Sequence, residues 1–336
     1  MRVGSILRLV LVGIVMAGIA LAVALGFHWL PDQASRQSGR IHFVFWFVTG
    51  ICIAIFALVT AVIAYSMVKF RRSPDDDSDG PPIHGHTGLE IVWTVIPTLL
   101  VTAISILSAV VLAKNGDAGP NPLRVEVTAQ QFTWTFKYPS LGNVQTAALR
   151  LPLGRAVELT LHSEDVIHSF WVPEFSQKQD VVPGITTTLV ITPDKLGTFP
   201  VICTELCGLG HALMRSSATV MQQQDFDTWA AGQRLALNGP QGQAGKTVFA
   251  NNGCGACHTF RPAGTTGMVG PDLDKLPAEA QKAGKPLQDF VRESIVNPNA
   301  YIEPGYQKNV MPGTFGQLPR AQLDALVKFL TQKGSQ

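Results

Sequence analysis

The chain has 336 residues, which leaves room for two small domains together with membrane segments. Its formal net charge is only +2 and no basic stripe is present, so we expect no nucleic-acid partner. Four of the five cysteines fall into two metal-type motifs and the fifth, Cys52, lies in an apolar run. A structural framework of disulfides is therefore excluded.

Three apolar runs free of charged residues occupy the first third of the chain, at residues 9–27, 43–68 and 91–113. A helix of roughly 20 apolar residues spans a bilayer, so the second and third runs predict a transmembrane helical hairpin within residues 40–115. Residues 1–27 fit either a secretory signal peptide or a first membrane helix. The basic start and the Ala-Val-Ala ending favour a signal peptide, which would leave two transmembrane helices in the mature chain.

The orientation of the hairpin follows from Lys69, Arg71 and Arg72, which directly follow the second run. Basic residues mark cytoplasmic loops, so the polar stretch at residues 73–90 predicts a cytoplasmic turn. Everything after the third run is then outside. We expect a bacterial inner-membrane protein with its C-terminal domains on the periplasmic or outer face.

Short β-rich runs separated by Pro, Gly and Asp turns follow from residue 120 to residue 225. Their spacing predicts an all-β sandwich or barrel. The clearest runs are residues 123–128, 132–136, 156–161, 187–192 and 198–203. A helix and linker are expected at residues 226–243, and helical periodicity continues from residue 244 to residue 336.

Two thiols, an imidazole and a thioether lie within twelve residues, at Cys203, Cys207, His211 and Met214, and His168 lies upstream. Soft sulfur ligands with imidazoles suit copper or zinc, and a thioether favours copper. Two thiolates four residues apart can bridge two metal ions. The alternatives are a disulfide between the two cysteines, which leaves the other ligands unexplained, and a zinc site, which does not need the methionine.

A second motif, Cys254-Gly-Ala-Cys257-His258, has the attachment pattern of a c-type haem. The two cysteines would form thioethers to the haem vinyl groups, and His258 would ligate the iron. A methionine as sixth ligand raises the haem potential, which suits a donor to copper. Met311 and Met268 are the two candidates for this ligand.

Residues 40–232 resemble cytochrome c oxidase subunit II. The resemblance is carried by the aromatic stretch at residues 131–138, by residues 163–173 and 180–184, and by the string from Cys203 to Met214. It implies a cupredoxin-like fold and a dinuclear copper centre, CuA. The implied copper ligands are His168, Cys203, Cys207, His211, Met214 and the backbone carbonyl of Glu205. The Glu205 side chain would reach a magnesium ion shared with subunit I.

Three further residues take a role from this resemblance. Phe132 occupies the position where the family commonly has a tryptophan for electron entry, and Trp134 matches a tryptophan of the pattern. Both are electron-transfer candidates, with ordinary sandwich packing as the alternative. Glu90 aligns with the glutamate near the mouth of a proton pathway into subunit I. The alternative for Glu90 is a favourable charge at a helix N-terminus.

Residues 241–334 resemble the small class I cytochromes c, through Gly245, Phe249 and the Gly-Pro-Asp-Leu loop at residues 270–273. This resemblance favours Met311 as the sixth ligand and leaves Met268 as a loop or packing residue. The expected fold is a membrane-anchored multidomain chain. It would comprise residues 1–27, the hairpin at 40–115, a cupredoxin-like CuA domain at 120–225, a helix and linker at 226–243, and an all-α cytochrome c domain at 244–336.

The expected function is that of subunit II of a haem–copper cytochrome c oxidase. Electrons would enter at the covalent haem c, pass to CuA and reach subunit I, where oxygen reduction is coupled to proton transport. The expected partners are subunit I, other oxidase subunits, the membrane, and an external donor such as a soluble cytochrome c or a quinol–cytochrome c reductase. A CuA-bearing subunit of a nitric oxide reductase and a free membrane-anchored electron carrier are the alternatives.

Overall fold

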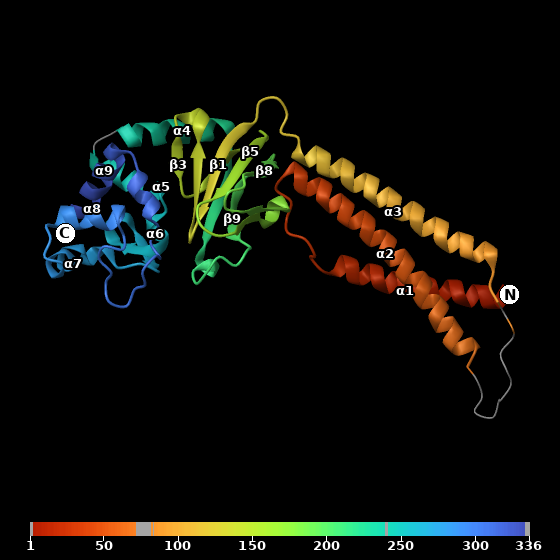
Figure 1. Ribbon diagram of the computed structural model, residues 1–336. Helices are drawn as coiled ribbons and strands as arrows, with labels where there is room; N and C mark the ends of the chain where they lie inside the picture. The colour runs from red at the N-terminus through yellow and green to blue at the C-terminus, as the bar shows by residue number, and fades with distance from the viewer. Residues whose placement is uncertain (1–2, 72–81, 83, 239–240, 333–336) are drawn as a thin grey trace. The chain divides into compact units, whose positions relative to one another are not determined.

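The computed structural model describes residues 3–71, 82, 84–238 and 241–332 (Figure 1). The chain divides into two compact units. The first comprises Met1–Asp32 and Gly39–Asn115, and the second comprises Gln33–Ser38 and Gly116–Gln336.

Three apolar helices make up the first unit: α1 (Val3–Gly26), α2 (Arg36–Lys69) and α3 (Thr87–Gly116). All three are long and apolar enough to cross a membrane. This corrects the expected hairpin of two helices, because the first run is also a continuous helix of 24 residues. At about 1.5 Å per residue it reaches about 36 Å, enough for a bilayer core and longer than the apolar region of a typical signal peptide.

The beginning of α2 is tied to the end of α3 by one side chain. Arg40 Nη1 donates to the backbone oxygen of Lys114 at 3.0 Å and to Oδ1 of Asn115 at 3.1 Å. Most of the predicted cytoplasmic turn, residues 72–81 and 83, lies outside the described residues.

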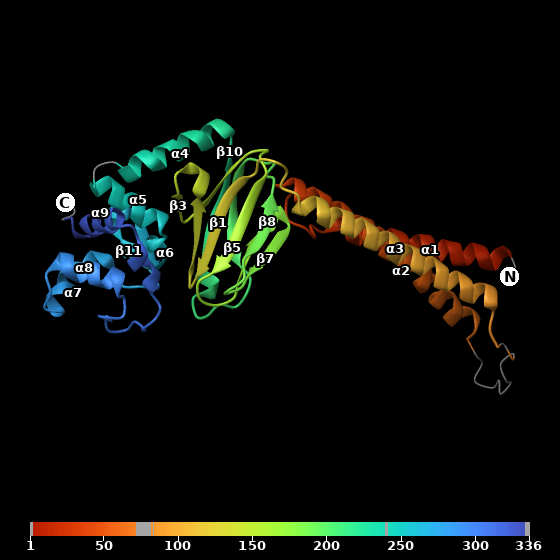
Figure 2. The ribbon, with the colours of Figure 1, turned by 45° about the horizontal axis from the view of Figure 1, so that its top comes forward.

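A sandwich of two five-stranded sheets forms the first part of the second unit, as Figure 2 shows. The strand order is β3-β2-β1-β5-β8 in one sheet and β4-β10-β9-β6-β7 in the other. The strands are β1 (Leu123–Gln130), β2 (Thr133–Tyr138), β3 (Val144–Thr146), β4 (Leu149–Pro152), β5 (Val157–Ser163), β6 (His168–Val172), β7 (Gln177–Val181), β8 (Thr187–Ile191), β9 (Gly197–Cys203) and β10 (Arg215–Met221). β1 runs parallel to β5 and β4 runs parallel to β10, while the other pairs are antiparallel.

Alternating side chains build the core between the sheets. In β2, Trp134, Phe136 and Tyr138 are buried while the threonines and the lysine between them are partly exposed. Because neighbouring side chains of a strand point to opposite faces, this alternation places every second residue inside. Each fully buried large apolar side chain stabilises the fold by about 1.5–3 kcal/mol.

The segment Gln33–Ser38 packs on the sandwich and is part of the second unit. The Ala34 amide donates to the backbone oxygen of Glu174, and the Arg36 amide donates to that of Thr192, both at 3.0 Å. Gln37 Oε1 accepts the Thr192 amide at 2.9 Å. This short polar segment is therefore held by backbone pairing, which the sequence pattern did not predict.

A helical domain follows the sandwich. It begins after α4 (Gln223–Asn238), which starts three residues before the helix and linker expected at residues 226–243, and residues 239–240 of that region lie outside the described residues. Its helices are α5 (Gln241–Asn251), α6 (Cys254–Cys257), α7 (Leu276–Lys282), α8 (Leu287–Val296) and α9 (Arg320–Thr331). A two-stranded sheet, β11 (His258–Phe260) with β12 (Thr265–Met268), departs from the all-α expectation.

The first and last helices of this domain, α5 and α9, pack in direct contact at Gly245. A Cβ atom at this position would lie only 2.1 Å from the backbone oxygen of Ala325 and 2.5 Å from Cβ of Phe329. Only glycine allows this approach. The buried face of α9 carries Leu323, Leu326, Val327 and Leu330.

Candidate metal centres

The predicted copper ligands gather at one end of the sandwich. His168 begins β6 and Cys203 ends β9, and antiparallel pairing of these strands brings the two residues together. Cys207 and His211 lie in the connection from β9 to β10, and Met214 directly precedes β10. The sheet therefore positions His168 and Cys203, and one short connection supplies Cys207, His211 and Met214.

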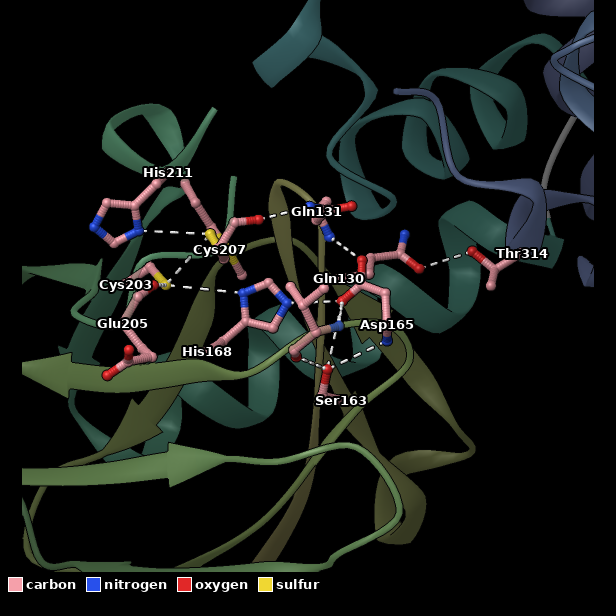
Figure 3. A network of polar contacts seen from close by, with 12 residues as sticks. Gln130, Gln131, Ser163, Asp165, His168, Cys203, Glu205, Cys207, His211 and Thr314 are labelled. Carbon is pink, nitrogen blue, oxygen red and sulfur yellow. Dashed lines mark hydrogen bonds and ion pairs between the residues drawn. The ribbon is translucent and has the colours of Figure 1, made fainter. Parts of the chain in front are cut away.

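The donor atoms converge in the arrangement that Figure 3 shows in part. The two sulfur atoms of Cys203 and Cys207 are 3.8 Å apart. Cys203 Sγ lies 3.8 Å from Nδ1 of His168 and 3.3 Å from the carbonyl oxygen of Glu205. Cys207 Sγ lies 3.5 Å from Nδ1 of His211 and 3.8 Å from the sulfur of Met214.

This donor set fits a pair of copper ions. Both cysteines are free thiols, and their sulfur separation of 3.8 Å is far from the roughly 2.05 Å of a disulfide bond. His168, Cys203, Cys207 and Met214 are buried, so the donors face each other away from water. Two thiolates, two imidazoles and a thioether form the soft set that copper prefers.

The two thiols differ in acidity. Burial alone would raise the pKa of Cys203, but hydrogen bonds from His168 and from nearby backbone groups lower it below the ordinary value. Burial raises the pKa of Cys207, and the charge of its neighbour Cys203 raises it further. Metal ions that bind here must displace the second proton, so binding releases protons.

Asp165 is a site residue that sequence reasoning missed. Its Oδ1 accepts a hydrogen bond from Nε2 of His168 at 2.8 Å, and its carboxylate also accepts the backbone amides of Gln131 at 2.6 Å and Val166 at 2.7 Å. Burial is the largest single effect and lowers the pKa of His168, but the hydrogen bonds and charge interactions with Asp165 and Cys203 together outweigh it and raise the pKa to about 9. A carboxylate three residues before a predicted ligand was the available signal.

The haem motif forms the short helix α6 and the residue that follows it. Cys254 and Cys257 occupy the two ends of this helix, and His258 comes next. Nδ1 of His258 donates to the backbone oxygen of Pro271 at 2.7 Å, which leaves Nε2 as the nitrogen available to a metal. Burial lowers the pKa of His258, so the ring is kept neutral, as a ligand must be.

A large cavity lies against this motif and fits a flat apolar group. Its lining includes both cysteines, His258 and apolar side chains such as Phe290 and Leu326. Gly270 closes one wall, where a Cβ atom would fall 2.5 Å from the His258 ring. The cavity and the attachment motif together fit a covalently bound haem.

The two candidate methionines lie in different places. Met311 lines the cavity, whereas Met268 is 87% exposed and pairs with His258 only through the strand backbone. Asn309 adopts a left-handed backbone conformation with φ of 62° two residues before Met311. Asn299 holds it there through two hydrogen bonds of 2.8 Å, one to its side chain and one from its amide.

Comparison with known proteins decides the family. Residues 146–221 match the periplasmic domain of cytochrome C oxidase subunit II, residues 20–111 match its transmembrane domain, and residues 242–333 match cytochrome c. Cytochrome c oxidase subunit 2 of Synechocystis sp. is 33% identical over 280 residues, which cover 69% of this chain and 84% of that protein. The chain belongs to the cytochrome c oxidase subunit II family.

A second relative supports this assignment. Cytochrome c oxidase subunit 2 of Alkalihalophilus pseudofirmus is 32% identical over 292 residues, covering 83% of this chain and 82% of that protein. The crystal structure of the periplasmic domain of subunit II of cytochrome oxidase from Bradyrhizobium japonicum is 25% identical and covers 35% of this chain and 97% of that chain, with a TM-score of 0.34. The family and its cytochrome c domain imply copper and haem c binding, and the chain is a subunit of an oxidoreductase complex.

Within this subunit II, the two aromatic candidates lie in different surroundings. Trp134 is only 1% exposed, and its ring lies edge-on to the His168 ring with centroids 6.2 Å apart. Phe132 is partly exposed and lines the haem cavity. Trp134 therefore belongs to the core beside a copper ligand, and Phe132 lies on the side of the haem motif.

Glu90 lies at the start of α3, and Glu205 lies in the connection that carries the copper ligands. In the first turn of α3, Glu90 accepts the backbone amide of His86 at 3.2 Å, so it contributes to capping the helix. The Glu205 side chain is exposed while its carbonyl faces Cys203. Among the described residues, the donor atoms of His168, Cys203 and Cys207 form the one converging group of three His, Cys, Asp or Glu ligands, and Glu205 does not belong to it.

Proposed function

We propose that this chain is the electron-entry subunit of a haem–copper cytochrome c oxidase that carries its own haem c and a dinuclear CuA centre. The observation that carries the proposal is the convergence of the donor atoms of Cys203, Cys207, His168, His211 and Met214 at 3.5–3.8 Å contacts, in one compact unit with a Cys-x-x-Cys-His cavity. When bound, the two groups supply one-electron transfer from an external donor through haem c and CuA to subunit I.

The sandwich contributes a fixed donor set to this function. His168 and Cys203 are anchored on paired strands, and Asp165 fixes the ring orientation of His168. A rigid set of ligands needs little rearrangement when the charge of a metal centre changes, which favours rapid electron transfer. The edge-on ring of Trp134 packs against His168 and restricts its movement further.

The helical domain contributes the haem ligands. Cys254 and Cys257 would form thioethers to the vinyl groups, His258 would bind the iron, and Met311 would supply a sulfur ligand. Pro271 orients the His258 ring through its backbone oxygen. Histidine and methionine together raise the haem potential, as a donor to copper requires.

The connection that carries the copper ligands also carries a surface for a partner. Leu206, Leu209 and Leu213 are 78%, 90% and 60% exposed. Apolar side chains gathered on one exposed connection are typical of a protein–protein contact. We assign subunit I to this surface, and the exposed Glu205 would share a magnesium ion with it there. The relatives named above are cytochrome c oxidase subunits, which favours oxygen over nitric oxide as the terminal acceptor and a complex over a free carrier.

Metal content tests the proposal. The purified chain, matured with haem and loaded with copper, should hold two coppers and one haem c that acid–acetone does not extract. One zinc without copper would overturn the CuA assignment. A haem that acid–acetone extracts would overturn the thioether assignment.

Glu90 is proposed to lie near the mouth of a proton pathway into subunit I. Glu90→Ala should slow oxygen consumption by the assembled oxidase and leave electron transfer from haem c to CuA unchanged, because a carboxylate at a channel mouth collects and exchanges protons. Flash-triggered electron transfer measured beside steady-state oxygen consumption separates the two steps. Equal oxygen consumption at matched subunit assembly would leave Glu90 with only its helix-capping contact to His86.

A further inference from the structure

Residues 130–133, named here the docking segment, comprise the last residue of β1, the two residues that connect β1 to β2, and the first residue of β2. The docking segment lies between the two redox sites. Gln131, Phe132 and Thr133 line the same cavity as Cys257 and His258. On its other side the segment contacts the copper-ligand connection, where Nε2 of Gln131 donates to the backbone oxygen of Cys207 at 2.6 Å. The docking segment therefore contacts both sites at once.

Two glycines of the copper-ligand connection make this contact close. A Cβ atom on Gly210 would lie 2.4 Å from the Phe132 ring, and one on Gly208 would lie 2.8 Å from Nε2 of Gln131. Gly208 also has a backbone φ of 123°, which residues other than glycine rarely adopt. The connection between Cys207 and His211 is thus shaped to receive the docking segment.

The helical domain meets the docking segment and its neighbours through uncharged groups. Thr314 Oγ1 donates to Oε1 of Gln130 at 2.8 Å, and the Gln130 side chain is buried (Figure 3). Gln145 Nε2 donates to Oδ1 of the buried Asn252 at 3.2 Å. Gly253, directly before the haem motif, approaches Thr133 so closely that a Cβ atom would lie 2.8 Å from its hydroxyl oxygen. None of these contacts involves a charged side chain.

We infer that the docking segment is the port at which the chain's own cytochrome c domain sits, held by uncharged hydrogen bonds and closed to a soluble donor. The inference rests on the proposed function, because the domain acts there as the resident electron donor. One electron crosses the contact in each event, oxidising the haem iron and reducing the copper pair, with no bond made or broken. Docking through opposite charges weakens as salt screens them, whereas docking through buried neutral hydrogen bonds does not.

The experiment places two negative charges opposite each other across the port. It uses the full chain assembled with its partner subunits. The variant Gln130→Glu/Thr314→Glu should raise amide hydrogen exchange in residues 130–133 about tenfold and slow haem-to-copper electron transfer about tenfold or more. Gln130→Glu/Thr314→Lys should restore both measurements, and its rate should then fall as salt is added. The control Gln224→Glu/Thr228→Glu adds the same charges on exposed positions of α4 and should change neither measurement.

Wild-type electron transfer should stay within about twofold between about 0.01 and about 0.5 M salt. A wild-type rate that falls about tenfold over this range would overturn the uncharged port, and so would a Gln130→Glu/Thr314→Glu variant that exchanges and transfers electrons like wild type. The optical spectrum and metal content are recorded first for every variant. Missing copper or missing haem contradicts the proposed function, while both groups present with no effect of the charge pair contradicts the port.

Discussion

At the end of the sandwich, five side-chain donors already lie 3.5–3.8 Å from one another in successive pairs, whereas in the helical domain the expected haem ligands border a wide cavity. His168 and Cys203 lie on paired strands of the sandwich, whose core of apolar side chains packs between the two sheets, and the other three ligands lie in the connection from β9 to β10. The haem ligands belong to a domain whose interior contains the cavity itself. The first region is a scaffold that receives its metal, and the second is a fold that its prosthetic group completes.

The difference predicts opposite consequences of removing each group. A chain with Cys254→Ser/Cys257→Ser, matured without haem, should lose cooperative unfolding of residues 244–332, because a large apolar cavity carries a heavy penalty. A chelator that removes copper should lower the stability of the sandwich by about 4 kcal/mol or less. Hydrogen exchange resolved by segment measures both.

Either of two outcomes would contradict this difference between the sandwich and the helical domain. If residues 123–221 lost protection when copper was removed, the copper would be part of the sandwich core. If the haem-free helical domain kept full protection, the packing of α5 on α9 would suffice to hold its fold.

The two methionines test whether the cavity wall or the strand supplies the haem sulfur. Met311→Ala should abolish the weak near-infrared band of oxidised methionine-ligated haem and lower the haem potential, because Met311 lines the cavity. Met268→Ala is the matched control and should leave the band intact, since this side chain is 87% exposed. Loss of the band in the control with survival in the Met311 variant would reverse the assignment.

Asp165 tests how much the sandwich depends on hydrogen bonds outside the ligand set. Asp165→Ala should weaken copper binding about 10–100-fold, because the carboxylate no longer orients the His168 ring. Glu164→Ala is the control, since this neighbouring carboxylate contacts His162 and no copper ligand. Competition with a chelator, followed through the visible spectrum, gives both affinities. Equal copper affinities in the two variants would show that strand β6 alone fixes the position of His168.

Asn299 tests the corresponding support on the haem side, with the smallest expected effect. Asn299→Ala removes two hydrogen bonds that hold the loop before Met311. Because both hydrogen bonds lie at exposed residues, we expect a combined net contribution of about 0.5–1.5 kcal/mol, so that added imidazole displaces Met311 about 2–12-fold more readily. Asn297→Ala, at an exposed position nearby, should bind imidazole like wild type. An unchanged imidazole titration for Asn299→Ala would show that the cavity wall holds the loop without this pair.

The ligand motifs could be predicted because their spacing is local. Cys203, Cys207 and Met214 lie within one stretch, and Cys254, Cys257 and His258 fit one turn and the residue after it. For Trp134 the sequence leaves electron transfer and ordinary packing both open, and the structure buries this side chain in the sandwich core. Local sequence patterns thus suffice to predict the strands, the helices and the residues nearest the copper and haem sites.

What the sequence could not predict depends on pairings far apart in the chain. Gln131 meets Cys207 across 76 residues, and Thr314 meets Gln130 across 184 residues, so no local pattern signals either contact. The sequence does not decide between a signal peptide and a first membrane helix for another reason. Both begin with basic residues before an apolar run, so the same pattern predicts either.

The contact between α5 and α9 at Gly245 has a consequence for the order of events during biogenesis. α5 precedes the haem motif and α9 is the last of the described helices, so the contact that closes the domain cannot form until α9 has been synthesised and exported. Until then Cys254 and Cys257 lie in an open segment, although burial in the closed fold raises the pKa of both thiols. The late arrival of α9 thus leaves an interval in which the two thiols stay exposed and reactive, and haem attachment can precede closure.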